Sequence, residues 1–185
     1  QDEVNIFEAL KRNEKLKTLQ SLSLFGMKNK QWSQRAPLLP SPAYTVDLIS
    51  HFCHLQHLTV RSPMLSERLM VELADASRDK LLYLQILLTY SAHQAEFRVP
   101  EISSSAWSAL CARSPRLEVE CVIMSRVPYL DLGAVLKPEV PLTSMTVLKY
   151  ARCSQDFLHS LSQKFKATLR DFLCYTDPSD CGDEL

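Results

Sequence analysis

The sequence predicts an α/β fold built from a repeated unit. Two observations predict it: a short leucine pattern recurs along the chain, and apolar residues at helical spacing fill the intervals between its copies. One strand and one helix cannot bury their own apolar faces, so stacked units must share a continuous core. We therefore expect a right-handed leucine-rich-repeat solenoid with irregular repeats, parallel strands on its concave face and helices on its convex face.

The leucine pattern is clearest in two segments, Leu16–Leu24 (LKTLQSLSL) and Phe52–Val60 (FCHLQHLTV). Both read apolar-x-x-Leu-x-x-Leu-x-apolar, and further copies follow at intervals of roughly 25 to 36 residues. Ser114–Ile123 is a weaker copy, in which apolar residues alternate as in a half-buried strand, and this alternation directs Cys121 to the core. The phase of the pattern likewise predicts that Cys174 points inward and is buried. The predicted repeat strands lie near residues 19–25, 55–61, 81–89, 117–123, 142–150 and 169–175.

Helical patterns occupy the intervals between these strands. Ser66 and Ser154 each precede a helical run, and their hydroxyl groups are predicted N-caps. Trp107 lies within another such run and is predicted to belong to the core. The buried helix faces are expected to carry Val4, Ile6, Phe7 and Leu10; Val46, Ile49 and Cys53; Leu69, Val71 and Leu73; Trp107, Leu110 and Cys111; and Phe157, Leu158, Leu161 and Phe165.

Residues 1–185 are predicted to form a single leucine-rich-repeat domain. The chain starts within a helical pattern and stops where another helix is expected, so we expect a fragment of a longer array. Three intervals are irregular and are predicted to be insertions, at residues 28–44, 91–101 and 125–141. Insertions in repeat arrays emerge as loops, often on the binding face. A tolerated surface loop is the equal alternative.

Composition argues against several function classes. The chain has 21 Lys plus Arg and 21 Asp plus Glu, so there is no basic field for nucleic acid. It has only three glycines, which argues against a Rossmann or P-loop phosphate site. Its six cysteines are scattered, as in reduced intracellular proteins, and no apolar run is long enough for a membrane span. We expect a cytoplasmic or nuclear protein that binds neither nucleic acid nor membrane.

A cluster of histidines and one cysteine raises the alternative of a metal site. His51, Cys53, His54 and His57 lie within seven residues. The repeat places the first three at the end of a helix and His57 in the next strand, so their side chains are expected to diverge. No second Cys/His pair or hydrolase motif is present. We predict no metal, no cofactor and no catalytic residues, with a metal-dependent or thiol enzyme as the minor alternative.

The candidate partner-binding residues are the outward positions of the repeat strands. Leucines of the pattern face the core, and side chains alternate along a strand, so the residues between and just after the leucines face outward. A row of Phe25, Leu87, Leu148 and Tyr175 is expected to form an exposed apolar stripe for a protein, unless a loop or tail covers it. The candidate partner-binding residues are Phe25, Thr59, Arg61, Gln85, Leu87, Thr146, Leu148, Leu173 and Tyr175.

Three segments resemble the substrate-binding half of F-box/leucine-rich-repeat proteins: Ser103–Ile123, Leu136–Leu148 and Phe165–Tyr175. The likeness is to the irregular-repeat subgroup that includes the cryptochrome-binding F-box proteins. These segments show its tryptophan-bearing helix, its Ser-Pro-x-Leu-x-Val strand and its Pro-x-x-Pro-Leu strand entry. The resemblance implies a substrate receptor of a Skp–cullin–F-box ubiquitin ligase, which holds a protein substrate on its concave face.

The F-box motif itself is not visible in the chain. Leu38–Phe52 resembles its start only faintly, because Pro42 stands where the motif has an acidic residue. The resemblance therefore implies that a Skp-type adaptor and a cullin bind through an F-box outside this chain. A leucine-rich-repeat adaptor or inhibitor with no ubiquitin-ligase role is the alternative.

Overall fold

The fold is α/β, with one sheet of six parallel strands that are arranged in the order of the sequence. The computed structural model describes residues 4–24, 41–77, 79–88, 100–124, 132–148 and 155–175. Each predicted strand range contains one strand of the sheet. The strands are β1 (Ser21–Leu24), β2 (His57–Arg61), β3 (Tyr83–Leu88), β4 (Glu118–Ile123), β5 (Leu142–Val147) and β6 (Asp171–Cys174).

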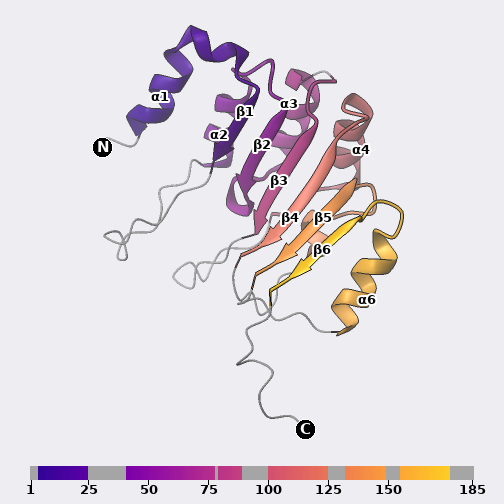
Figure 1. Ribbon diagram of the computed structural model, residues 1–185. Helices are drawn as coiled ribbons and strands as arrows, with labels where there is room; N and C mark the ends of the chain where they lie inside the picture. The colour runs from indigo at the N-terminus through magenta and orange to yellow at the C-terminus, as the bar shows by residue number, and fades with distance from the viewer. Residues whose placement is uncertain are drawn as a thin grey trace, which may run out of the picture.

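Helices alternate with the strands, as the sequence predicts. Figure 1 shows α2, α3 and α4 behind the strands, and α3 packs against both α2 and α4. No helix in the described part of the chain lies in front of the sheet in this view, and we call this side of the sheet the open face. The helices are α1 (Val4–Arg12), α2 (Pro42–Ile49), α3 (Glu67–Ser77), α4 (Ser104–Arg113), α5 (Leu132–Val135) and α6 (Gln155–Lys164), with 3₁₀ turns η1 (Glu14–Thr18) and η3 (Ser62–Met64).

Core-facing side chains form continuous rows across the sheet. The strands alternate buried and half-buried or exposed positions, because successive side chains point to opposite faces. The central row joins one residue from each strand in register. It consists of Leu24, Val60, Ile86, Cys121, Met145 and Phe172. All of these except Phe172 are buried, so the predicted strand segments share one core.

The last strand departs from this pattern. Cys174 is predicted to point inward, and it does pair in register with the buried Val147. It is nevertheless exposed, and Phe172 is 39% exposed. No described strand pairs with the far edge of β6. The prediction of a buried Cys174 is therefore wrong, because a core-side residue is covered only where neighbouring units flank it.

The helix faces agree with the sequence pattern at most positions. Ser66 is an N-cap, since its hydroxyl accepts a hydrogen bond from the Leu69 amide at 3.1 Å. Leu69 and Leu73 are buried on one face of α3, but Val71 is 49% exposed because it lies between them on the opposite side. Cys53 is also exposed, because α2 ends four residues earlier, at Ile49. Leu161 on α6 and Phe165, just after its last residue, are buried as predicted. The remaining predictions concern side chains outside the described residues, namely Val4, Ile6, Phe7, Ser154, Phe157 and Leu158.

Two predicted insertions contain helical structure. The last residues of the 28–44 insertion begin α2, where Ser41 caps the Tyr44 amide at 3.2 Å and Pro42 occupies the first helical position. Proline is favoured there because its missing N–H has no helical partner to lose. The 125–141 insertion contains the short helix α5, as its sequence suggests. Residues 28–40, 91–99 and 125–131 of the three insertions lie outside the described residues.

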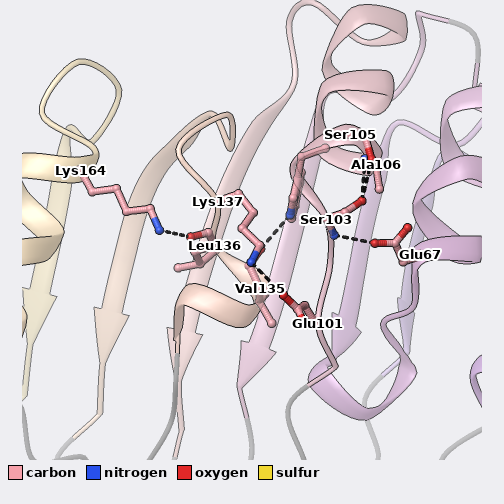
Figure 2. Close-up of polar contacts among 10 residues, drawn as sticks. Glu67, Glu101, Ser103, Ser105, Ala106, Val135, Leu136, Lys137 and Lys164 are labelled. Carbon is pink, nitrogen blue, oxygen red and sulfur yellow. Dashed lines mark hydrogen bonds and ion pairs between the residues drawn. The ribbon is translucent and has the colours of Figure 1, made fainter.

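Polar contacts join neighbouring units beside the apolar core (Figure 2). The Glu67 carboxylate of α3 accepts a hydrogen bond from the Ser103 amide at 2.6 Å, and the Ser103 hydroxyl in turn caps α4. The buried Trp107 indole donates to the Val135 carbonyl at 2.7 Å. Lys164 donates to the Leu136 carbonyl at 2.5 Å. The contacts of Glu67, Trp107 and Lys164 each join neighbouring elements, so specific hydrogen bonds as well as packing hold these elements together.

Replacement of Trp107 tests this packing. Trp107→Ala is expected to lower the free energy of unfolding by about 3 to 5 kcal/mol, because it leaves a large cavity. Trp107→Phe should cost about 1 to 3 kcal/mol, because the Val135 carbonyl loses its buried donor. Urea denaturation measures both. Val71→Ala on exposed α3 surface is the control and should change stability by less than about 0.5 kcal/mol. Equal effects for Trp107→Phe and Val71→Ala would contradict the role of the hydrogen bond.

Cys121 should resist alkylation in the native protein. Complete burial raises the pKa of its thiol, and the thiolate is the reactive form. Iodoacetamide at mildly alkaline pH should modify the exposed Cys53 and Cys174 and leave Cys121 unmodified until denaturant is added. Peptide mapping by mass spectrometry reads out each site. Modification of Cys121 at the rate of Cys53 would show that it is not buried.

Candidate functional site

The open face of the sheet carries three rows of side chains that follow the strand register. The first row is Ser21, His57, Tyr83 and Glu118; the second row is Ser23, Thr59, Gln85, Glu120, Ser144 and Asp171; and the third row is Arg61, Leu87, Val122, Thr146 and Leu173. The second row is entirely polar, whereas the third row is mainly apolar. A partner that lies on this face would therefore meet adjacent polar and apolar strips.

A hydrogen-bond network orients the middle of the second row. The Thr59 hydroxyl donates to the Gln85 side-chain oxygen at 3.2 Å, and the Gln85 side-chain nitrogen donates to Glu120 Oε2 at 2.6 Å. The Tyr83 hydroxyl also donates to Glu120 Oε2. These residues come from three adjacent strands, which lie about 4.8 Å apart in a sheet. The network holds the Glu120 carboxylate in place on the central strand β4.

The environment of Tyr83 keeps its hydroxyl protonated. Partial burial raises the pKa of the Tyr83 phenol, and the hydrogen bond to Glu120 raises it further. Tyr83 therefore remains a donor to Glu120 throughout the neutral range. Arg61 in the third row is also partly withdrawn from water, and this burial lowers the pKa of its guanidinium.

The predicted apolar stripe is wrong in two respects. Leu87 is 9% exposed and thus buried, although it stands on the same face as the half-buried Gln85, in register with Arg61 on β2 and Val122 on β4. Leu148 does not share its row, since Leu87 aligns through Val122 with Thr146. Leu148 and Tyr175 lie two residues beyond the third row, and Leu148 is half-buried whereas Tyr175 is 56% exposed. Phe25 lies outside the described residues.

Leu148 lies outside the row because Leu84 aligns through Val119 with Leu142, six residues before Leu148, and a register shift between β4 and β5 then adds only one residue to β5. Val119 pairs with Leu142, but Glu120 pairs with Ser144, so Thr143 is an extra residue in β5. Leu142 and Met145 are three residues apart, whereas side chains alternate with a period of two. The extra residue lets both face the core, and both are completely buried. It also shifts every later residue of β5 relative to β3.

Other predicted residues do meet on the open face. Thr59 and Gln85 share the second row, while Arg61, Thr146 and Leu173 lie in the third row with Leu87. Leu173 is 51% exposed. Sequence reasoning missed the open-face residues Tyr83, Glu118, Glu120, Val122, Ser144 and Asp171. The alternation of Val119, Cys121 and Ile123 could have identified the three that belong to β4, because the residues between inward positions face outward.

The histidine and cysteine side chains of the 51–57 cluster turn to different partners. Cys53 contacts the Lys17 carbonyl at 3.8 Å, and His54 Nδ1 lies 3.2 Å from the Lys80 ammonium. His57 lies on the open face, with its ring centroid 6.2 Å from that of Tyr83. Within the described ranges, no group of three or more His, Cys, Asp or Glu side chains is placed to hold a metal ion.

A shallow depression lies at the start of β2, β3 and β4. It has a volume of about 450 Å³ and is lined by His57, Leu82, Tyr83, Arg116 and Glu118. Glu118 is compensated by Arg170, whose guanidinium lies 3.5 Å from its carboxylate. The depression thus carries charges of both signs and continues directly into the first row of the open face.

A scan against protein-family models finds no match to this chain, and a search of curated proteins finds no match either. Among the described residues, no helix is long and apolar enough to cross a membrane.

The Tyr83 environment predicts a loss of stability at alkaline pH. Because folding raises the pKa of this phenol, its contribution is fully present below the unfolded value of about 10 and falls as the pH rises above that value. The stability difference between the wild type and Tyr83→Phe should therefore shrink above about pH 10. Urea denaturation at a series of pH values measures it. A constant difference across this range would contradict the raised pKa.

Proposed function

We propose that this chain is a protein-recognition module that binds a partner on the open face of its sheet. The observation that supports this proposal is the set of three rows on that face, in which an oriented polar network lies beside an apolar strip. Within the described residues no helix covers these rows. Protein interfaces combine apolar contact area with oriented polar groups in this way. The module is a right-handed leucine-rich-repeat solenoid in this proposal, and the open face is its concave side.

The partner would be a substrate of a ubiquitin ligase. In this proposal the chain is the substrate-binding part of an F-box receptor, with no catalytic residues of its own, acting in the cytoplasm or nucleus. A Skp-type adaptor and a cullin would bind through an F-box outside these residues. The three segments that carry the resemblance supply α4 with β4, then β5, then β6, and these strands are neighbours in the sheet. Their adjacency supports one shared recognition surface.

Charge and bulk introduced on the open face should abolish partner binding. Thr146→Arg and Leu173→Arg each add a cationic side chain to the third row without breaking a hydrogen bond of the second-row network. We expect each to lower affinity by about tenfold or more, with little change in melting temperature. Ala109→Arg on the exposed surface of α4 is the matched control and should bind normally. Quantitative capture of partners from a cell lysate, with each variant as bait, measures this.

The same capture experiment separates the two candidate roles. Bait consisting of the full-length protein should retain a Skp-type adaptor and a cullin together with a partner that the open-face variants lose. Retention of that partner without the adaptor and cullin favours a leucine-rich-repeat adaptor or inhibitor. Partner binding that survives both Thr146→Arg and Leu173→Arg but fails with Ala109→Arg would place recognition on the helices and overturn the proposal.

A further inference from the structure

We propose that Glu120 receives a lysine or arginine side chain from an extended segment of the partner protein. This inference rests on the proposed function, because it concerns a ligand on the same open face. It specifies the chemistry of that ligand: a basic residue over the second row, with an apolar residue two positions away over the third row.

The Glu120 carboxylate is held on one side only. Both of its hydrogen bonds, from the Gln85 amide and the Tyr83 hydroxyl, reach Oε2. No donor among the described residues bonds to Oε1. An ionised carboxylate has two oxygens and acts only as an acceptor. The network thus fixes the orientation of the group and leaves one oxygen to accept from a donor outside the described residues. Charge-assisted bonds of this type are stronger than neutral ones.

Glu118, on the same face, is a carboxylate whose charge is compensated by a basic side chain of the chain itself. It precedes Glu120 by two residues and pairs with Arg170 at 3.5 Å. No ion pair joins Glu120 to a described basic residue, although it lies nearer the centre of the sheet. Glu118 and Glu120 therefore form a natural comparison, since they share a strand and a face but differ in charge compensation.

The surroundings of Glu120 favour a cation. Asp171 lies in the same row on β6, two strands away, which is about 10 Å and close to the screening length at physiological salt. Between β3 and β6, the second and third rows contain these two carboxylates and no basic residue, and the one basic residue of the two rows, Arg61, lies on β2, two strands from Glu120 and in the other row. A Lys or Arg side chain that approaches this part of the face is therefore attracted by both carboxylates.

The third row indicates which residue of the partner segment should lie near its basic residue. It lies two residues along the strands from the second row, a separation of about 6.7 Å. In an extended peptide parallel or antiparallel to the strands, side chains two residues apart have the same separation and face the same way. A basic residue above Glu120 would then place an apolar residue above Val122, beside Leu87 and Thr146. The expected motif is a basic and an apolar residue separated by one residue, in either order.

A displayed library of random linear peptides tests this motif. Selection on the wild-type protein should enrich Lys or Arg two positions from Leu, Ile, Val or Phe. Selection on Glu120→Gln should lose the preference for the basic residue and keep the preference for the apolar one. Glutamine retains an oxygen that can accept from Gln85 and Tyr83, so the network can persist without the charge. Glu118→Gln is the matched control and should select the same motif as the wild type.

Affinity measurements on one selected peptide complete the test by changing the charge of the peptide as well as that of the protein. Its arginine is replaced by citrulline, which has nearly the same shape and no charge. Fluorescence anisotropy should show the arginine peptide binding wild type about tenfold more tightly than the citrulline peptide, and the difference should shrink at high salt. On Glu120→Gln most of this difference should disappear, because the remaining carboxylate, Asp171, lies about 10 Å away and is largely screened.

The possible failures are distinguishable. Selected peptides that bind the open face but show no basic preference would overturn the assignment of Glu120 and leave the proposed function in place. A basic preference that persists in Glu120→Gln would overturn the assignment in the same way. A library that yields no peptide sensitive to Thr146→Arg would overturn both this inference and the proposed binding face.

Discussion

The structure depends on the burial of each strand's core-facing side chains between the two neighbouring units. Leu58 and Leu84 pair in register across β2 and β3, and both are completely buried. A single unit has no way to cover these side chains, since its own helix shields only one part of its strand. The exposure of β6 shows what happens where this burial is incomplete. Phe172 stands on the core side in register with Met145, yet it remains partly exposed where no described strand follows.

This burial determines the geometry of the open face. Because the core side chains lock each strand against the next in one register, the opposite side chains also fall into rows. Thr59, Gln85 and Glu120 can hydrogen-bond in sequence only because β2, β3 and β4 hold them opposite one another. The rows of the open face are thus a consequence of core packing, and the residues of its polar network all belong to the strands β2, β3 and β4.

The extra residue in β5 shows how the core takes precedence over the open face. Leu142 and Met145 both enter the core, although their spacing of three conflicts with strand alternation. The sheet accommodates both through the register shift at Thr143. On the open face, the extra residue places Thr146 rather than Met145 in register with Leu87, and Leu148 lies two residues beyond that row. Burial of two large apolar side chains outweighs the loss of a regular ladder at one position.

The sequence by itself determined where the six strands lie and the inward direction of residues such as Leu58, Leu84 and Cys121. Both follow from local alternation of side chains along a strand, which a single segment reveals. It also identified Thr59 and Gln85 as outward residues. Only the tertiary structure decided that Gln85 bridges Thr59 and Glu120, that Leu87 is covered and that Cys174 is exposed. These outcomes depend on which residues of separate strands pair and on what flanks each strand, and alternation within one segment carries no information about either.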